Sequence, residues 1–281
     1  MGRIVAMRFK PGTGYLWAWL AILFSIALFA AAPAWAGELD EFDDDPFAGY
    51  EDIEEDNDPL EIPNRFIFAF NQALDFALIR PIAWVYREAV PQVVRNSIRN
   101  FLRNLKTPVI LANDFLQGDL ERARITTVRF VINTTGGLLG FFDLATDEGY
   151  PYHSEDFGQT LGTWGVGEGI YLVLPLLGPS SARDATGLVV DHFMDPLTHI
   201  ANNQDKEEWL LYRTALEGLD FRARNIDTLD EIERDSLDLY ARLRSLYRQH
   251  REAEIDNKTD ADSEQDVGLY GPRVKTKAAQ E

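Results

Sequence analysis

The sequence predicts an all-α fold, and three observations support that class. Apolar residues recur at helical spacing in successive segments of residues 59–254. Prolines stand where helices are expected to begin. No stretch alternates apolar and polar residues for long enough to build a sheet, and only residues 170–174 resemble a strand. We therefore expect helices throughout this region, interrupted by one apolar, glycine-rich segment.

Each helix before the glycine-rich segment is placed by a residue that favours a helix start or stop. These signals are, in order, Asn64 as a cap, Pro81 in a first turn, Pro91 at a start, Thr107-Pro108 at the start of a shorter helix, Gly118 at its stop and Asp119 as a cap. After the segment, Ser180 or Ser181 is expected to cap a helix, and two further helices are expected at about residues 206–224 and 229–254.

Residues 133–178 combine many glycines with large apolar side chains. Glycine inside an element lowers stability, so this combination is typical of places where backbones approach closely or turn back in an apolar setting. Within it, Leu138, Leu139, Phe141 and Phe142 lie in a run without charge, bounded by glycines. We expect this run to form an apolar hairpin next to membrane lipid and to gate a path for it.

The charge of the chain is concentrated in its tails. The net charge is −19, and residues 37–64 contain thirteen acidic residues and no basic one. The basic surface that nucleic-acid binding needs is absent, so no nucleic-acid partner is expected. The chain contains no cysteine, which excludes a disulfide framework, a thiolate metal site and a cysteine nucleophile within these residues.

The N-terminus has the three-part layout of a secretory signal peptide. A basic start precedes a long uncharged run that ends in Ala34-Trp35-Ala36, so residues 1–36 are expected to be removed on export. The same run is long enough to span a bilayer if it is kept. Residues 37–58 are expected to form a disordered acidic arm, and residues 255–281 a polar C-terminal tail.

A stripe of basic residues is the first candidate site. Arg95, Arg99 and Arg103 recur at every fourth position on one helix, with Lys106 close to the same line. Guanidinium groups bind phosphate through paired hydrogen bonds, so the stripe is a candidate for binding lipid head groups. The alternative is an ordinary solvated helix face.

A second candidate is the segment Gly178-Pro-Ser180-Ser-Ala182, which approaches the Gly-x-Ser-x-Gly nucleophile elbow. Its partners would come from Asp184, Asp191, His192 and His199. The last glycine of the motif is missing and no βα series surrounds it, so a helix cap explains the serines more simply. An exported serine-type lipid hydrolase centred on Ser180 remains an alternative function.

Two weaker patterns favour structural roles. Gly165, Gly167 and Gly169 are followed by a strand-like run, so a tight turn is preferred to a phosphate cradle. His153, Glu155 and Asp156 are too few for an ordinary zinc site, and Glu155 or Asp156 is expected to cap a helix instead. No catalytic set, metal site or cofactor is expected.

From about Asp58 to Arg251, the chain resembles the MlaA (VacJ) family of outer-membrane phospholipid-transport proteins. The most specific motifs are Gly136-Gly137-Leu138 with Phe142-Asp143, Phe157-Gly158-Gln159-Thr160-Leu161-Gly162, Trp164-Gly165-Val166-Gly167, and Gly178-Pro179-Ser180 with Arg183-Asp184. Asp58-Pro-Leu-Glu61, Arg80-Pro81, Leu116-Gln117-Gly118 and Asp238-x-Tyr240 add to the resemblance.

The resemblance implies a ring of amphipathic helices around an amphipathic path, on the periplasmic side of the outer membrane. Such a protein removes mislocalised phospholipid from the outer leaflet and passes it to a soluble, MlaC-like periplasmic carrier. It associates with a trimeric porin, and a scaffold that only binds porin is the remaining alternative. Many members are lipoproteins, whereas this chain has no cysteine to acylate. The path is expected to be lined by Phe66, Phe70, Leu138, Leu139, Phe141, Phe142, Leu161, Trp164 and Val166, with Arg95, Arg99, Arg103 and Lys106 at the head groups.

Overall fold

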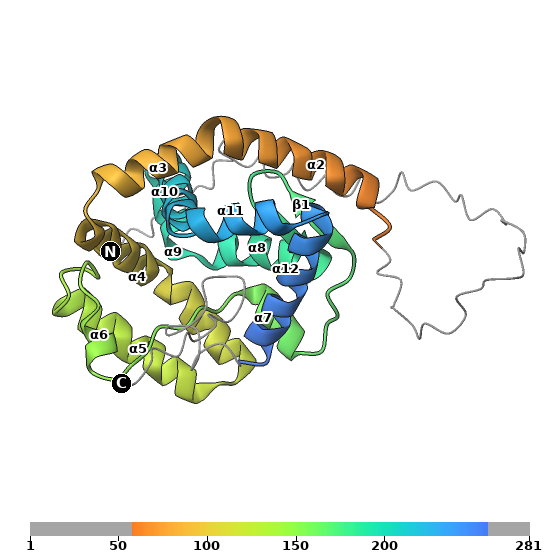
Figure 1. The fold of residues 1–281 in the computed structure, drawn as a ribbon. Coiled ribbons are helices and arrows are strands. Elements are labelled where there is room, and N and C mark those ends of the chain that lie inside the picture. The colour runs from red at the N-terminus through yellow and green to blue at the C-terminus, as the bar shows by residue number, and fades with distance from the viewer. Residues whose placement is uncertain (1–57, 258–281) are drawn as a thin grey trace, which may run out of the picture.

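A computed structural model describes residues 58–257 of the chain (Figure 1). The described part consists mainly of helices and contains one two-stranded sheet. The prediction of an all-α fold is therefore confirmed. The expected signal peptide, nearly all of the acidic arm and all but the first residues of the C-terminal tail lie outside the described residues.

The elements follow one another along the chain with short connections. The first six are α2 (Glu61–Leu74), the π-helix η1 (Asp75–Ile79), α3 (Arg80–Ala89), α4 (Gln92–Gln117), α5 (Leu120–Thr135) and α6 (Leu144–Asp147). Next come α7 (Phe157–Thr163), β1 (Tyr171–Leu174), β2 (Gly178–Ser181) and α8 (Ala182–Met194). The last four are α9 (Pro196–Asn203), α10 (Glu208–Arg224), α11 (Ile226–Asp235) and α12 (Leu239–Ile255).

Most of the expected helix boundaries are confirmed. Pro91 directly precedes α4, which ends at Gly118 in the left-handed conformation with φ of 79°. The side chain of Asp119 caps α5 by accepting a hydrogen bond from the Arg122 amide. Of the two candidate serines, Ser181 caps α8 by accepting from the Asp184 amide.

The prediction that Asn64 caps the first helix is wrong. α2 begins at Glu61, and Asn64 lies inside it with its side chain buried. The Asn64 amide donates to the Tyr171 carbonyl at 3.0 Å, and its oxygen accepts from the Val173 amide at 2.9 Å. A buried backbone edge needs hydrogen-bond partners, so this residue satisfies a strand rather than a helix start.

Two other helix predictions are also wrong. No new helix begins at Thr107-Pro108, because α4 continues through Pro108. Proline removes one hydrogen bond from a helix, but burial of Val109 and Ile110 next to it favours the continuous helix. The segment expected as one helix over residues 229–254 is two helices, since Asp238 caps α12 by accepting from the Ala241 amide.

The strand-like run at residues 170–174 is confirmed as β1, and its partner β2 was not expected. The two strands are antiparallel, with Leu174 opposite Gly178, so residues 175–177 form the turn. Tyr171 and Val173 are buried against Tyr240 of α12, with Ile67 and Phe68 of α2 packed beside them. The hairpin is therefore stabilised by two helices that are far apart in the sequence.

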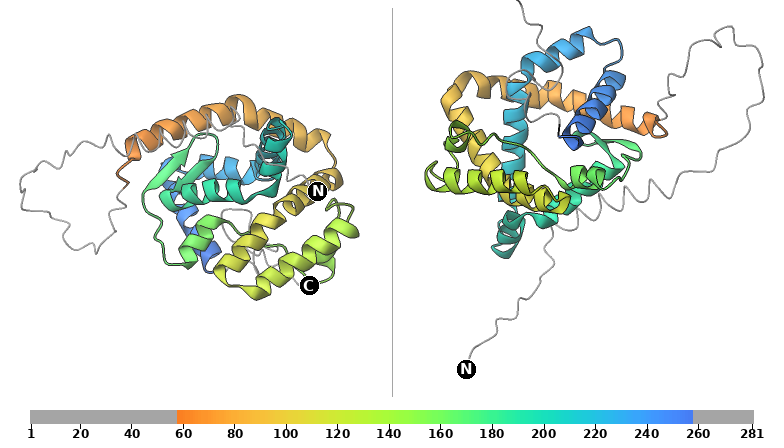
Figure 2. Two further views of the ribbon diagram at one scale, coloured as in Figure 1. Left: turned by 180° about the vertical axis from the view of Figure 1, so that it is seen from behind. Right: turned by 90° about the horizontal axis from the view of Figure 1, so that it is seen from below.

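The views show how the helices are arranged. α2, η1 and α3 form one long helix along an edge, and α4 and α5 continue around the periphery (Figure 1). α9 projects on one side of this layer and α11 on the other (Figure 2). α7 and α8 approach closely at two glycines. A Cβ atom added to Gly187 would lie 2.4 Å from the Gly158 amide nitrogen, so a larger residue would not fit there. This contact confirms one of the two roles expected for glycine in the sequence.

Candidate functional site

The long helix formed by α2, η1 and α3 presents an apolar face outward. It extends over residues Glu61–Ala89, is long and apolar enough to cross a membrane by length and composition, and its apolar part is almost entirely unburied. Its exposed side chains include Phe66, which is 77% exposed, and Phe70, two of the residues expected in the lipid path. The others are Ile62, Phe76, Leu78, Ile82, Trp84 and Val85. An apolar surface of this extent on one helix indicates contact with lipid or protein.

The expected apolar hairpin is the connection between α5 and α6. Leu138, Leu139, Phe141 and Phe142 are all exposed there. Leu138 and Leu139 have φ of 51° and 61°, in the left-handed backbone region that residues other than glycine rarely adopt. The Phe141 ring stacks on Phe101 of α4, with centroids 4.8 Å apart. The loop therefore has one aromatic ring packed on α4 and two leucines that are exposed.

Residues of α4 and α5 hold this loop in place. The Asn104 side chain donates to the Leu139 carbonyl at 3.2 Å and to the Thr134 hydroxyl at 3.0 Å. A Cβ atom on Gly140 would lie 2.4 Å from Asn104, and one on Gly137 would lie 2.2 Å from the Phe142 carbonyl. Both glycines are needed for these close approaches. The backbone of the loop is thus fixed while its leucines stay exposed.

The remaining path residues lie at the end of α7. Trp164 and Val166 are exposed, and Leu161 is half-buried. The Trp164 indole donates to the Leu116 carbonyl at 3.0 Å, and its ring meets Phe157 edge to face. α2 and the connection between α5 and α6 lie at opposite ends of the molecule in all views (Figures 1 and 2). The nine residues expected in one path are therefore distributed over three parts of the fold.

The arginine stripe on α4 faces other parts of the protein. Arg99 forms an ion pair with Asp220 of α10 at 3.0 Å, and Lys106 lies 3.8 Å from Glu217 of the same helix. The Arg103 guanidinium lies over the Tyr152 ring, 4.1 Å from its centre. Arg95 is half-buried and donates a hydrogen bond to the Gln92 side chain at 3.2 Å in the first turn. Head-group binding by these residues stays a prediction, and Arg99 already stabilises a contact between two helices.

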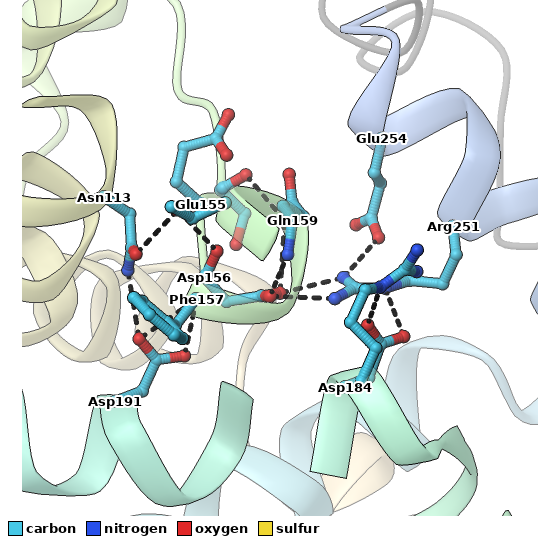
Figure 3. A network of polar contacts seen from close by, with 12 residues as sticks. Asn113, Glu155, Asp156, Phe157, Gln159, Asp184, Asp191, Arg251 and Glu254 are labelled. Carbon is cyan, nitrogen blue, oxygen red and sulfur yellow. Dashed lines mark hydrogen bonds and ion pairs between the residues drawn. The ribbon is translucent and has the colours of Figure 1, made fainter. Parts of the chain in front are cut away.

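A network of charged residues joins α12 to α7 and α8 (Figure 3). Arg251 binds both oxygens of Asp156 at 2.8 Å and donates to Asp184 at 2.8 Å and Glu254 at 2.9 Å. The Tyr247 hydroxyl also donates to Asp184. We call these five residues the Arg251 network. Asp156 caps α7 as expected, by accepting from the Gln159 amide. The same carboxylate also forms the ion pair with Arg251.

The pKa values of the Arg251 network follow from its contacts. Burial alone raises the pKa of Asp156, but hydrogen bonds from Arg251 lower it to about 2. The pKa of Asp184 is lowered in the same way, since the donors of Arg251 and Tyr247 outweigh burial. Both carboxylates are therefore charged at neutral pH and depend on Arg251.

Glu155, the other expected cap, is buried elsewhere. It pairs with Arg122 of α5 and accepts a hydrogen bond from Gln117 of α4 at 2.7 Å. Burial raises its pKa to about 7, although Arg122 and Gln117 act in the opposite direction. Asp114 and Asp156 add repulsion that raises the pKa further. The folded protein thus holds a proton that the unfolded chain releases near pH 4.5.

Stability is expected to fall as the pH rises through about 7, because the Glu155 contribution is complete below pH 4.5 and is lost at the folded-state pKa. Its full size is at most about 3 kcal/mol. Thermal unfolding followed by circular dichroism at pH 6 and pH 8 measures the effect. His250 contributes with the same sign, since Glu254 raises its pKa. The Glu155→Gln variant should therefore flatten the pH dependence without abolishing it, and an unchanged slope would contradict this assignment.

The structure gives the two serines of the elbow-like motif different surroundings. Ser180 is a buried residue of β2, paired with Leu172 across the hairpin, whereas Ser181 caps α8. The two histidines expected as its partners contact Phe193 instead, since the His192 ring meets the Phe193 ring edge to face and the His199 Nε2 lies 2.7 Å from the Phe193 carbonyl oxygen. A nucleophile elbow needs an exposed serine on a sharp turn, and Ser180 lies in a strand.

Ser181→Ala is expected to lower the free energy of unfolding by about 1 kcal/mol, because it removes the α8 cap. The neighbouring Ser180 does not cap the helix, so Ser180→Ala serves as the matched control. Chemical denaturation of both variants measures the difference. Equal losses in the two variants would contradict the assignment of the cap to Ser181.

Two hollows of different character are described by their lining residues. The larger, of about 510 Å³, lies between η1, α3 and α11 and is lined by Phe76, Trp84, Ile226 and the Arg80–Asp230 pair, among others. The smaller, of about 20 Å³, is polar and includes Arg103, Asn104 and Tyr152. Residues 58–257 hold no group of three His, Asp or Glu side chains placed to bind a metal ion.

Sequence reasoning missed the partners of the buried charges. Arg251 and Asp184 are 67 positions apart and no local pattern connects them. Arg129 and Asp143 likewise form a buried pair at 2.9 Å that fixes α5 to α6. Acidic residues at expected helix starts indicated that Asp156 caps α7, but they did not indicate its ion pair with Arg251.

Comparison with known proteins places these features in a family. The model of the MlaA lipoprotein family matches residues 56–254. The intermembrane phospholipid transport system lipoprotein MlaA of Escherichia coli is 36% identical over 200 residues, covering 70% of this chain and 77% of that protein. The protein of the same name from Haemophilus influenzae is 32% identical over 209 residues, covering 73% and 82%.

A solved structure is also similar to this chain. It is described as a structural basis for maintenance of bacterial outer membrane lipid asymmetry, and it matches with a TM-score of 0.62 and 34% sequence identity. The match covers 71% of this chain and 99% of that one. An uncharacterized protein of Rickettsia bellii is 31% identical over 242 residues, covering 84% and 93%.

Proposed function

Because this chain belongs to the MlaA family, we propose that it is the outer-membrane component of an intermembrane phospholipid transport system. In this role it removes mislocalised phospholipid from the outer leaflet and so maintains lipid asymmetry. The observation that carries the proposal is the family match over residues 56–254, which includes nearly the whole described fold. The name of the E. coli relative and the subject of the solved structure agree with it.

The exposed apolar surfaces support a position in the membrane. The outward face of α2, η1 and α3 and the loop at Leu138–Phe142 are suited to acyl chains, which need no hydrogen-bond partners. Polar and charged side chains lie between the helices, as in the Arg251 network. We infer a ring that lies in the membrane, with lipid contacts outside and polar contacts within.

The path and its partners belong to the same proposal. Leu138, Leu139, Phe141 and Phe142 would gate the path, and Arg95, Arg103 and Lys106 would meet phosphate groups that enter it. Arg99 contributes by holding α4 on α10 through Asp220. A soluble periplasmic carrier would receive the lipid, and a trimeric porin would hold the protein in place. We infer that the chain catalyses no reaction, which is consistent with the buried position of Ser180.

The proposed function is tested in cells that lack their own copy of the transport component. Expression of this chain should clear phospholipid from the outer leaflet and restore resistance to detergent. Native mass spectrometry of the purified protein should show bound phospholipid, with porin co-purifying. A chain that reaches the outer membrane but leaves surface phospholipid unchanged would contradict transport, and cleavage of lipid that requires Ser180 would favour the hydrolase.

A further inference from the structure

The turn of the β1–β2 hairpin presents two adjacent leucines to the exterior. Leu176 is 66% exposed and Leu177 is 62% exposed. No charged residue occurs between Glu168 and Arg183, so the whole hairpin is uncharged. Transfer of exposed leucine side chains from water into hydrocarbon has a favourable free energy, and an uncharged hairpin adds no charged group that would oppose it.

The backbone conformation of this turn is unfavourable for the residue that occupies it. Leu176 has φ of 67°, the left-handed conformation in which glycine or asparagine is normally found in turns. A leucine there costs free energy that a glycine would avoid. An unfavourable backbone that the fold maintains is a reason to look for a function of the side chain.

Two asparagines of α2 hold the hairpin against that helix. Asn64 binds the edge of β1, as described above. Asn71 donates to the Leu174 carbonyl at 2.9 Å and accepts from the Leu176 amide at 2.9 Å. The two residues are seven positions apart and therefore lie on the same face of α2. The turn is thus fixed by its backbone on both sides, and its leucine side chains remain outside.

The turn is continuous with the apolar face of α2. Phe70 precedes Asn71 and is itself exposed, and Phe66 lies one turn earlier. The residue that joins the helix to the turn is Asn71, whose side chain is uncharged and occupied by the turn backbone, so no charged group lies at the point of contact. A surface that contacts acyl chains along α2 would include the tip as well.

We propose that the Leu176–Leu177 turn, held by Asn71, inserts into the hydrocarbon of the membrane and helps to attach this protein to it. The inference rests on the proposed function and adds a mode of attachment to it. Asn71 acts as a positioning residue, because it binds the backbone of the turn and leaves the leucines free for lipid.

The chain has no cysteine, so a single introduced cysteine can carry a fluorescent label without background. The full chain with Leu177→Cys is labelled with an environment-sensitive fluorophore and mixed with vesicles of phosphatidylethanolamine and phosphatidylglycerol. The label should shift to shorter wavelength and be quenched by nitroxides on the acyl chains. Leu237→Cys is the matched control, since this leucine is fully exposed among the polar residues Asp235, Ser236 and Asp238.

A third label at Phe70→Cys separates the two hypotheses. If Phe70 is quenched by the acyl-chain nitroxides while Leu177 stays accessible to an aqueous quencher, the helix contacts lipid and the turn does not, which overturns this inference alone. If neither label is quenched, the membrane position of the proposed function fails as well. Protection of Leu177 only after a trimeric porin is added would assign the turn to porin and overturn the lipid assignment.

Vesicle flotation provides a second measurement on unlabelled protein. Leu176→Ser with Leu177→Ser should lower the bound-to-free ratio by at least about tenfold, because two buried leucines are lost. Asn71→Ala should lower the ratio as well while both leucines remain, which a merely structural exposed turn does not predict. Leu237→Ser should leave it unchanged. Wild-type partitioning of the double variant, with circular dichroism unchanged, would overturn the inference.

Discussion

Arg251→Ala is expected to lower the free energy of unfolding by about 3 kcal/mol, because it removes the strongest donor shared by two carboxylates, the buried Asp184 and the half-buried Asp156. Arg251 is the common donor to Asp156 and Asp184, and its own side chain is only 13% exposed. The cost arises mainly from the desolvated charges that remain, not from the loss of one hydrogen bond. Urea denaturation at pH 7 measures it.

Arg65→Ala is the matched control for this variant. Arg65 also binds two carboxylates, Glu61 and Asp238, but all three side chains are more than 40% exposed. Exposed pairs contribute about 0–1 kcal/mol, so this variant should unfold almost as the wild type does.

The pKa values of Asp156 and Asp184 are lowered in the folded protein, so their contribution is present above the unfolded-state pKa and is lost as the pH falls towards 2. The loss in Arg251→Ala should therefore shrink in acid, and equal losses in the two variants would contradict the role of burial.

Phe141→Asp is expected to block phospholipid transport almost completely. Phe141 lies in the exposed loop between α5 and α6 and stacks on Phe101. A carboxylate at a surface that contacts acyl chains costs up to about 2–4 kcal/mol, depending on depth. Cells that depend on the variant should accumulate phospholipid in the outer leaflet and become sensitive to detergent.

Phe141→Leu is the control, because it keeps an apolar side chain at the same position. It loses the ring stacking, worth about 1 kcal/mol, and should retain transport. Immunoblotting of outer-membrane fractions establishes that both variants are present in equal amounts. If Phe141→Asp is present at the wild-type level and the outer leaflet stays free of phospholipid, the loop is not part of the path.

Local signals in the sequence determined the class of fold and most helix boundaries. Gly118 ends a helix because it can adopt the left-handed conformation, and Asp119, Asp156 and Ser181 cap helices because their side chains accept from backbone amides. These effects act within a few residues, so a single sequence reveals them. The exposed apolar loop at Leu138–Phe142 was also evident, since its glycines and its lack of charge are local properties.

Tertiary contacts decided the features that local signals placed wrongly. Asn64 resembles a helix cap, but its amide is used by the edge of β1, 107 residues away. Pro108 resembles a helix start, but burial on both sides of it keeps α4 continuous. The sequence also could not show that Arg99 of the arginine stripe pairs with Asp220 of α10, and head-group binding by the stripe stays a prediction. Hydrogen-bond and charge partners of this kind are satisfied by whichever residue the fold brings near, and sequence separation carries no information about them.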